Sequence, residues 1–240
     1  LLGSNTQFQG TTRRAGHGGS AIMTSSGNLP YLFGRQNDVR AIGGWTGRGI
    51  GTAGEERAGD AIVEIRETIR SAGALNVIAD GGRSYERTNG NARAIVDLRA
   101  ATAIPGVSGV VGAITGSATA RPHQYVGGPT PVPQAAFGGN AWAESYVSRT
   151  NAFGFISAIA NAEGGFGTTQ SGSSRALATA INNTDVIDFH NSPRNREAFA
   201  SATALSRADG SLSSPNNAIS KAKAESKVFG EAHATSRTQG

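Results

Sequence analysis

The segment nearest to a catalytic motif is GIGTAG at 49–54, which matches the glycine fingerprint of dinucleotide-binding enzymes. In that fingerprint the glycines open a helix that holds the pyrophosphate, and a later acidic residue meets the ribose. Asp80 follows the run LNVIA at 75–79 and has the position that such a residue needs. The segment 38–44, which should form the strand before the glycines, has few apolar residues. We therefore rank a dinucleotide enzyme last among the functions considered.

Other catalytic and metal-binding patterns are weak. The chain has no cysteine, which removes disulfides, thiol catalysis and thiolate metal sites. Its four histidines are far apart and lack the paired spacing of a metal site or a catalytic base. Asp185, Asp188 and His190 lie close together, but alternating acids on a strand more often face solvent. We expect no catalytic residue, no metal and no cofactor, and so no enzyme.

The scarce flat aromatic side chains are the best candidates for a ligand contact. Trp45, Trp142 and Tyr146 stand beside Gly, Asn and Arg residues, and Arg149 follows closely. Exposed rings of this kind stack on sugars or anchor a partner, although such rings also serve as core residues. Most cations are arginines, whose planar fork suits carboxylates and sulfates. These residues favour acidic glycans as ligands.

The elements that must position these residues are built from small side chains. Gly accounts for 34 of the 240 residues, while aromatic residues make up 6% and charged residues 16%. Any core must therefore be thin and closely packed. The net charge of +5 is too small to indicate a charge-driven disordered chain. Its cations are spread along the sequence, which favours simple solubility over nucleic-acid binding.

Alanine alternates with other residues in two segments near the C-terminus, 198–204 and 218–224. A period of two places alternate side chains on one face of an extended strand. The small face consists of Ala198, Ala200, Ala202, Ala204, Ala218, Ala222 and Ala224. Ala, Lys and Glu are also good helix formers, but the period favours a strand in the second segment.

Further alternating runs occur at 92–103, 111–120, 156–162 and 175–181. Gly, Pro or Asn turn residues bound each run. The pattern predicts an all-β fold, either antiparallel sheets or a sandwich or solenoid of short Ala/Gly/Ser-rich strands. One helix near 55–72 stays open, because Ile62, Ile65 and Ile69 share a helical face while Val63, Ile65 and Ile69 also fit a strand.

The segment 127–139 is rich in Gly and Pro and is the best internal boundary. It separates a β-rich N-terminal part at 1–126 from a β-rich C-terminal part at 140–240. A single domain over 1–240 is the alternative.

The one-sided alanine alternation resembles the secreted silk-like and secretory-gland structural proteins of arthropods. The resemblance implies an extracellular protein that assembles into a fibre, coat or matrix. Ala and Gly faces let flat sheets stack, and strand edges with few charges offer unpaired backbone groups to other copies. The chain starts at Leu1 rather than Met, as we expect of a processed secreted form, and has no apolar run long enough to span a membrane.

We therefore expect a secreted structural protein whose main partner is itself, with acidic glycans or other matrix proteins as further partners. Neither a membrane nor nucleic acid is expected to bind. The alternative is a soluble all-β module that binds glycans or another surface through Trp45, Trp142, Tyr146 and Arg149. An ice-binding surface ranks below glycan binding, because regular Thr-x-Thr rows are absent.

Overall fold

The computed structural model describes residues 18–29, 37–46, 57–70, 72–84, 87–100, 113–122, 136–150, 154–183, 198–208, 217–226 and 232–239. In these residues the chain forms twelve β-strands and no helix. The strands are β1 (Ala21–Leu29), β2 (Asn37–Ile42), β3 (Ala61–Ile69), β4 (Gly73–Gly81), β5 (Ala92–Ala100), β6 (Ile114–Pro122), β7 (Ala141–Thr150), β8 (Gly154–Gly164), β9 (Ser174–Asn183), β10 (Ala198–Ala208), β11 (Ala218–Ser226) and β12 (Ala232–Gln239). The all-β expectation is confirmed.

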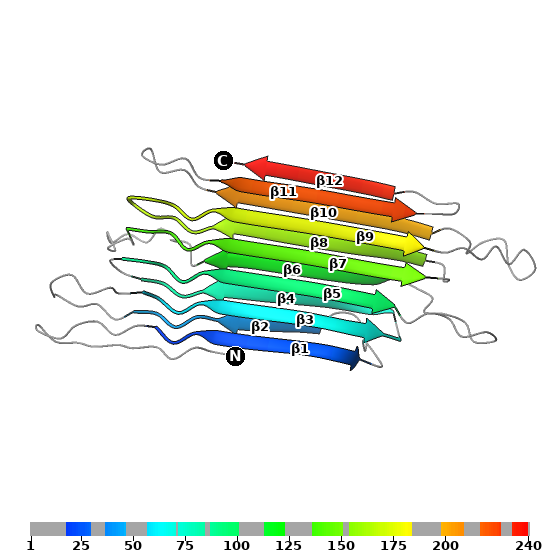
Figure 1. The fold of residues 1–240 in the computed structure, drawn as a ribbon, viewed down its shortest axis with the longest axis horizontal. Helices are drawn as coiled ribbons and strands as arrows, with labels where there is room; N and C mark the ends of the chain where they lie inside the picture. The colour runs from blue at the N-terminus through cyan, green and yellow to red at the C-terminus, as the bar shows by residue number, and fades with distance from the viewer. Residues whose placement is uncertain are drawn as a thin grey trace, which may run out of the picture.

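The strands form two six-stranded sheets that lie face to face (Figure 1). One sheet has the order β1-β3-β5-β7-β9-β11 and is called the odd sheet here. The other has the order β2-β4-β6-β8-β10-β12 and is called the even sheet. The chain crosses between the sheets after every strand, so two successive strands make one turn of a flattened coil.

Every strand pair in both sheets is parallel, so the predicted antiparallel arrangement is wrong. Short alternating strands with turn residues between them suggested hairpins, in which successive strands pair. Successive strands do run in opposite directions here, but they lie in opposite sheets (Figure 1). Each strand pairs with the next but one. The alternation of side chains is the same in both arrangements, so it could not distinguish them.

The helix considered near 55–72 is also wrong, because Ala61–Ile69 forms β3. Val63, Ile65 and Ile69 point into the core, where at most 3% of each is exposed, while Ile62 lies on the outer face. β3 pairs with β1 on one edge and β5 on the other, which satisfies its backbone groups in the extended state.

The inner faces of the two sheets form the core, whose side chains become smaller along the coil. β3, β4 and β5 contribute large residues such as Val63, Val77 and Leu98, whereas β8 to β10 contribute mostly alanines such as Ala160 and Ala178. The backbones of the two sheets lie closer together in the C-terminal turns than in the first ones. Small side chains therefore produce a thin core held by many weak dispersion contacts.

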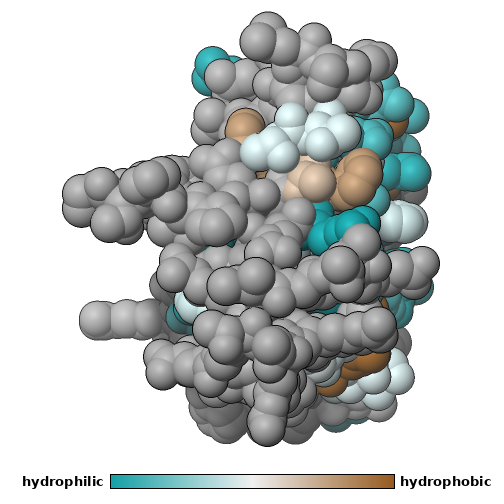
Figure 2. Space-filling model, turned by 90° about the vertical axis from the view of Figure 1, so that its left-hand side faces the viewer, coloured by the Kyte–Doolittle hydropathy of each residue, from teal (hydrophilic) through white to brown (hydrophobic). Residues whose placement is uncertain are grey.

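Glycines fill the end of the molecule where even strands end and odd strands begin. Segments from both sheets interlock there, and Gly59 N donates to Gly44 O at 2.9 Å while Gly82 N donates to Gly59 O at 2.8 Å. A Cβ on Gly59 would lie 2.0 Å from the carbonyl oxygen of Gly19, so only glycine fits. Figure 2 views this end and shows hydrophilic and hydrophobic residues interspersed in the coloured part of the surface.

Both sheets continue across the Gly- and Pro-rich segment 127–139. β5 pairs with β7, and β6 pairs with β8. Residues 127–135 lie outside the described part, and Gly138 donates its N–H to Gln170 O at 2.8 Å within the glycine-rich end.

Candidate functional site

The alanines of the predicted assembly face whose side chains are described lie between the two sheets of the chain itself. Ala200 and Ala202 of β10 are fully buried. Ala222 and Ala224 of β11 are partly buried and pack against the core. Ala218 is also partly buried. The backbones of Ala198 and Ala204 belong to β10, but their side chains lie outside the described part. This small-residue face therefore packs within the molecule.

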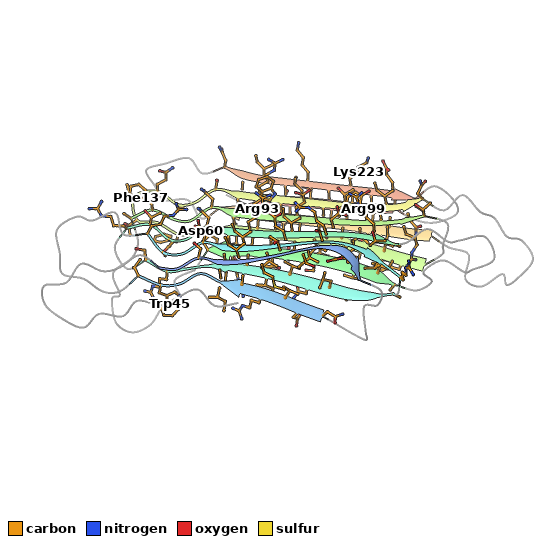
Figure 3. All side chains as sticks on the ribbon, turned by 60° about the horizontal axis from the view of Figure 1, so that its bottom comes forward. Trp45, Asp60, Arg93, Arg99, Phe137 and Lys223 are labelled. Atoms are coloured by element: carbon orange, nitrogen blue, oxygen red, sulfur yellow. The ribbon has the colours of Figure 1, made fainter. Side chains whose placement is uncertain are left out.

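The four predicted ligand-contact residues lie in three places. Trp142 and Tyr146 share the outer face of β7. Trp45 follows β2 at the glycine-rich end, where it is exposed, and Figure 3 shows it far from Arg99. Arg149 lies on the inner face of β7 and is only 1% exposed; its burial lowers its pKa to about 10. The structure thus brings together only Trp142 and Tyr146, because residues an odd number of positions apart, such as Trp142 and Arg149, lie on opposite faces of a strand.

Trp142 lies between two arginines of neighbouring strands. The parallel register places Arg93 of β5 and Arg175 of β9 beside it. Their guanidinium carbons lie 4.5 Å and 5.1 Å from the centroid of the indole ring, respectively. Because β5 and β9 flank β7 on opposite sides, the arginines cover both faces of the indole ring. Trp142 therefore offers no open ring face for a sugar to stack on.

A shallow groove lies over this Arg-Trp-Arg row, which we call the tryptophan groove. Its polar and aromatic lining among the described residues comprises Asn91, Arg93, Asn140, Trp142, Ser173, Ser174, Arg175 and Asn217. None of the described residues that line the groove is acidic. The groove therefore combines two cations with several amides and hydroxyls.

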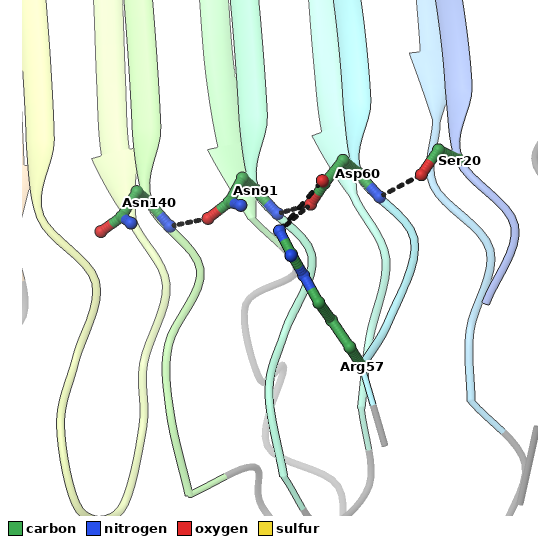
Figure 4. A network of polar contacts seen from close by, with 5 residues as sticks. All are labelled: Ser20, Arg57, Asp60, Asn91 and Asn140. Carbon is green, nitrogen blue, oxygen red and sulfur yellow. Dashed lines mark hydrogen bonds and ion pairs between the residues drawn. The ribbon is translucent and has the colours of Figure 1, made fainter. Parts of the chain in front are cut away.

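The asparagines belong to a hydrogen-bond ladder along the starts of the odd strands (Figure 4). Asp60 N donates to Ser20 Oγ at 3.2 Å, Asn91 N to Asp60 Oδ1 at 2.7 Å, and Asn140 N to Asn91 Oδ1 at 2.9 Å. Arg57 also forms an ion pair with Asp60 at 3.0 Å. Each turn thus uses a short polar side chain to accept the backbone N–H of the next turn.

The ladder determines what the amides offer to the groove. Asn140 Oδ1 accepts hydrogen bonds from Ser173 N and Ser173 Oγ, each at 2.9 Å. Because the oxygens of Asn91 and Asn140 are used as acceptors, the remaining group on each amide is an NH₂ donor. The sequence contains the signal for this ladder, since Ser, Asp or Asn precedes each odd strand, but the signal is visible only once the strands are aligned.

The two groove arginines differ in their charge partners. Arg93 forms an ion pair with Glu64 at 2.8 Å, and Glu64 also pairs with Arg66 at 2.6 Å. Arg175 contacts Trp142, and within the described residues no carboxylate lies within ion-pair distance of it.

A second groove farther along the same face has mixed charge. Its lining includes Glu144, Tyr146, Lys221 and Lys223. Lys223 forms an ion pair with Glu225 at 2.7 Å. Because Glu144 lines this groove and Glu225 pairs with Lys223, it has less net positive charge than the tryptophan groove.

Arg99 gives a comparable cation–aromatic contact outside both grooves. Its guanidinium carbon lies 5.5 Å from the Tyr146 centroid, and Asp97 pairs with it at 2.9 Å. This hydrogen bond to Asp97 raises the pKa of Arg99.

The residues of the dinucleotide hypothesis do not form a site in the described part. Asp80 is held by Arg40 and Arg121 on the outer face of the even sheet, at 2.5 Å in each ion pair. The hydrogen bond from Arg121 to Asp80 raises the pKa of Arg121. The helix that the fingerprint requires is replaced by β3, and residues 49–54 lie outside the described part.

The other candidate ligands remain without a described position. Asp185, Asp188 and His190 lie outside the described residues. In the part of the chain that is described, no three His, Asp or Glu side chains gather as a metal site. The same part contains no helix with the length and hydropathy to cross a membrane.

Comparison with known proteins finds no relative. No protein-family model matches the chain, and neither a curated protein nor a solved structure is similar to it.

Proposed function

We propose that this chain is a secreted structural protein that polymerises end to end, so that the coil of one copy continues in the next. The observation that carries the proposal is the open state of both ends of the coil. Among the described residues, no strand pairs with the outer edges of β1 and β2 or of β11 and β12. Unpaired edges of this kind are templates for further strands. The silk-like alternation of alanine supports the same proposal.

The edge strand β1 has none of the usual protection against such pairing. Proteins block exposed edges with charges, prolines, bulges or very short strands. β1 has the sequence AIMTSSGNL, which contains no charged residue and no proline. It extends over 9 residues, as does β11 at the other end of the odd sheet. The two edges are therefore equal in length, and β1 lacks the charges that β11 carries at Lys221, Lys223 and Glu225.

An apolar contact would join these edges if the intramolecular register continued. Ile22 of β1 and Ile219 of β11 lie in the same cross-strand row, at its two ends. They are 58% and 45% exposed, respectively, unusually high for large aliphatic residues. A second copy stacked on the first would place Ile22 of one copy beside Ile219 of the other. Both side chains would then lose water-exposed surface.

The hydrogen-bond ladder also has complementary ends. Within a copy, the backbone N–H of each turn donates to the side chain of the preceding turn. Ser20 starts the ladder with its N–H, and Asn217 stands at the corresponding position before β11. In a stack, Ser20 N of one copy would donate to Asn217 Oδ1 of another. The contact joins two different surfaces, and such head-to-tail contacts generate filaments unless the rotation closes a ring.

Two double variants test the proposal with the same positions changed in each. Ile22→Glu with Ile219→Lys places opposite charges across the junction, whereas Ile22→Lys with Ile219→Lys places like charges there. We expect the wild type and the Glu/Lys variant to form filaments and the Lys/Lys variant to stay monomeric. Light scattering over a concentration series and negative-stain microscopy measure the difference.

These measurements should use moderate salt. Arg40 and Arg237 share a row of the even sheet, so these two positive charges would meet across the junction, and salt screens their repulsion. Circular dichroism of each variant controls for folding. A wild type that stays monomeric at high concentration contradicts the proposal. So does a Lys/Lys variant that polymerises as well as the wild type.

A further inference from the structure

The tryptophan groove is rich in hydrogen-bond donors and poor in acceptors. Arg93 and Arg175 contribute guanidinium groups, and Asn91 and Asn140 contribute NH₂ groups whose partner oxygens are already used in the ladder. Within the described part of the chain, no acidic residue lines the groove. A ligand with several acceptor oxygens and a negative charge matches this surface.

The groove is also organised before a ligand arrives. Stacking on the indole ring of Trp142 holds both guanidinium groups in place, and the pair with Glu64 further restrains Arg93. The ladder fixes the asparagine side chains in the same way. Donors that are already ordered lose less conformational entropy on binding. Arg175 lacks a carboxylate partner in the described residues, so its charge is available to an incoming anion.

We infer that the tryptophan groove binds the oxyanion groups, carboxylate or sulfate, of an acidic polysaccharide. Arg175 supplies the main charge, and the amides of Asn91 and Asn140 donate to the ligand oxygens. A planar guanidinium can meet both types of group with two parallel hydrogen bonds. This inference does not require end-to-end assembly, because Arg93, Trp142 and Arg175 lie within one copy, although Asn217 and Ile219 belong both to the groove lining and to the proposed junction.

The same geometry disfavours single-stranded nucleic acid. Such ligands bind by stacking bases on open aromatic faces and by tracking the backbone with many cations. Both faces of Trp142 are covered by arginines, and the described lining of the groove holds two cations. The groove therefore fits isolated anionic groups better than a continuous phosphate chain.

The test compares polygalacturonate and dextran sulfate with neutral dextran and single-stranded DNA, by biolayer interferometry on immobilised protein. Two variants address the groove. Arg175→Gln removes the charge for which no described residue supplies a carboxylate partner. Asn140→Asp keeps an acceptor oxygen for Ser173 but replaces the NH₂ donor with a second carboxylate oxygen. The ladder accommodates an aspartate, because Asp60 occupies the equivalent position before β3. Arg99→Gln is the matched control, since it removes one charge stacked on an aromatic ring of the same sheet.

We expect one or both acidic polysaccharides to bind and neutral dextran not to bind. Each groove variant should weaken binding by about tenfold or more, as for a lost charged hydrogen bond, while Arg99→Gln changes it less than about threefold. The polymer that binds identifies the oxyanion. Equal loss in Arg99→Gln and Arg175→Gln would overturn the assignment to the groove. Absence of binding to both polymers would overturn it too, as would tighter groove-dependent binding of DNA.

Discussion

At the scale of single residues, the glycines near the turns have a role that their usual interpretation conceals. Glycine pairs in a sequence normally indicate turns. Here Gly19, Gly44 and Gly59 lie in backbone segments that interlock between the two sheets. Their value lies in the missing side chain, which lets two backbones approach to hydrogen-bonding distance.

Gly59→Ala is expected to destabilise the fold by at least about 3 kcal/mol, because its Cβ would lie 2.0 Å from a backbone carbonyl oxygen. Gly116→Ala is the comparison, since its nearest atoms are side-chain methyl groups of Val147 and Val96, at 2.8 Å and 3.0 Å, rather than backbone atoms. We expect a smaller loss there. Urea unfolding followed by circular dichroism measures both. Equal losses would show that the interlocked backbone adds no special constraint.

The burial of Arg149 leads to a second prediction at this scale, about how the free energy of unfolding depends on pH. Burial lowers its pKa to about 10, below the ordinary value, so the unfolded chain binds more protons at pH values above about 10. The free energy of unfolding must then rise with pH in that range. The buried charge costs stability at neutral pH, and this cost fades as the pH passes about 10.

Arg149→Met isolates the effect, because it keeps a long side chain and does not titrate. The difference in unfolding free energy, wild type minus variant, should increase by up to about 1.4 kcal/mol per pH unit above about pH 10. Denaturant titrations from about pH 9 to 11 measure it. A flat difference over that range would contradict the prediction, since lysines and tyrosines titrate alike in both proteins.

At the scale of elements, the strands could be predicted from the sequence but their partners could not. The period of two in 218–224 and 156–162 predicts β11 and β8 correctly. Period alone also places Trp142 and Tyr146 on one face and Arg149 on the other. Whether successive strands form hairpins or cross between sheets depends on the connections, whose Gly-rich sequences fit either path. For that reason the neighbours of Trp142, Arg93 and Arg175, could not be found without the structure.

The narrowing of the core along the coil leads to a prediction about how well each face of β8 tolerates a larger side chain. Ala160 of β8 is fully buried between closely spaced sheets, and Asn161 beside it faces outward. Ala160→Leu should therefore cost about 2 kcal/mol or more through overpacking, although it adds apolar surface. Asn161→Leu should change stability by less than about 1 kcal/mol. Thermal and urea unfolding of the two variants compare them, and a stable Ala160→Leu protein would mean that the sheets can separate locally.

At the scale of the whole molecule, the coil has a direction. One end presents β1 and β2, and the other presents β11 and β12, so the two ends differ in sequence. The parallel order that the sequence did not reveal is the source of this polarity. Pairing at the two ends would join unlike surfaces, which allows growth without a fixed number of subunits. Lateral association of outer faces would instead involve surfaces that every copy retains.

Polarity predicts that a copy with one defective end stops growth. Ile22→Lys damages the β1 edge and leaves the β11 edge intact, so the variant should add to a filament at one end and then block further addition there. Small fractions mixed with wild type should shorten filaments in proportion to the fraction added, as measured by electron microscopy. Ile62→Lys is the control, because this residue lies in the same row but one strand inside the β1 edge, where β1 separates it from another copy. If Ile22→Lys leaves filament length unchanged, growth does not proceed through the strand edges and must use the outer faces.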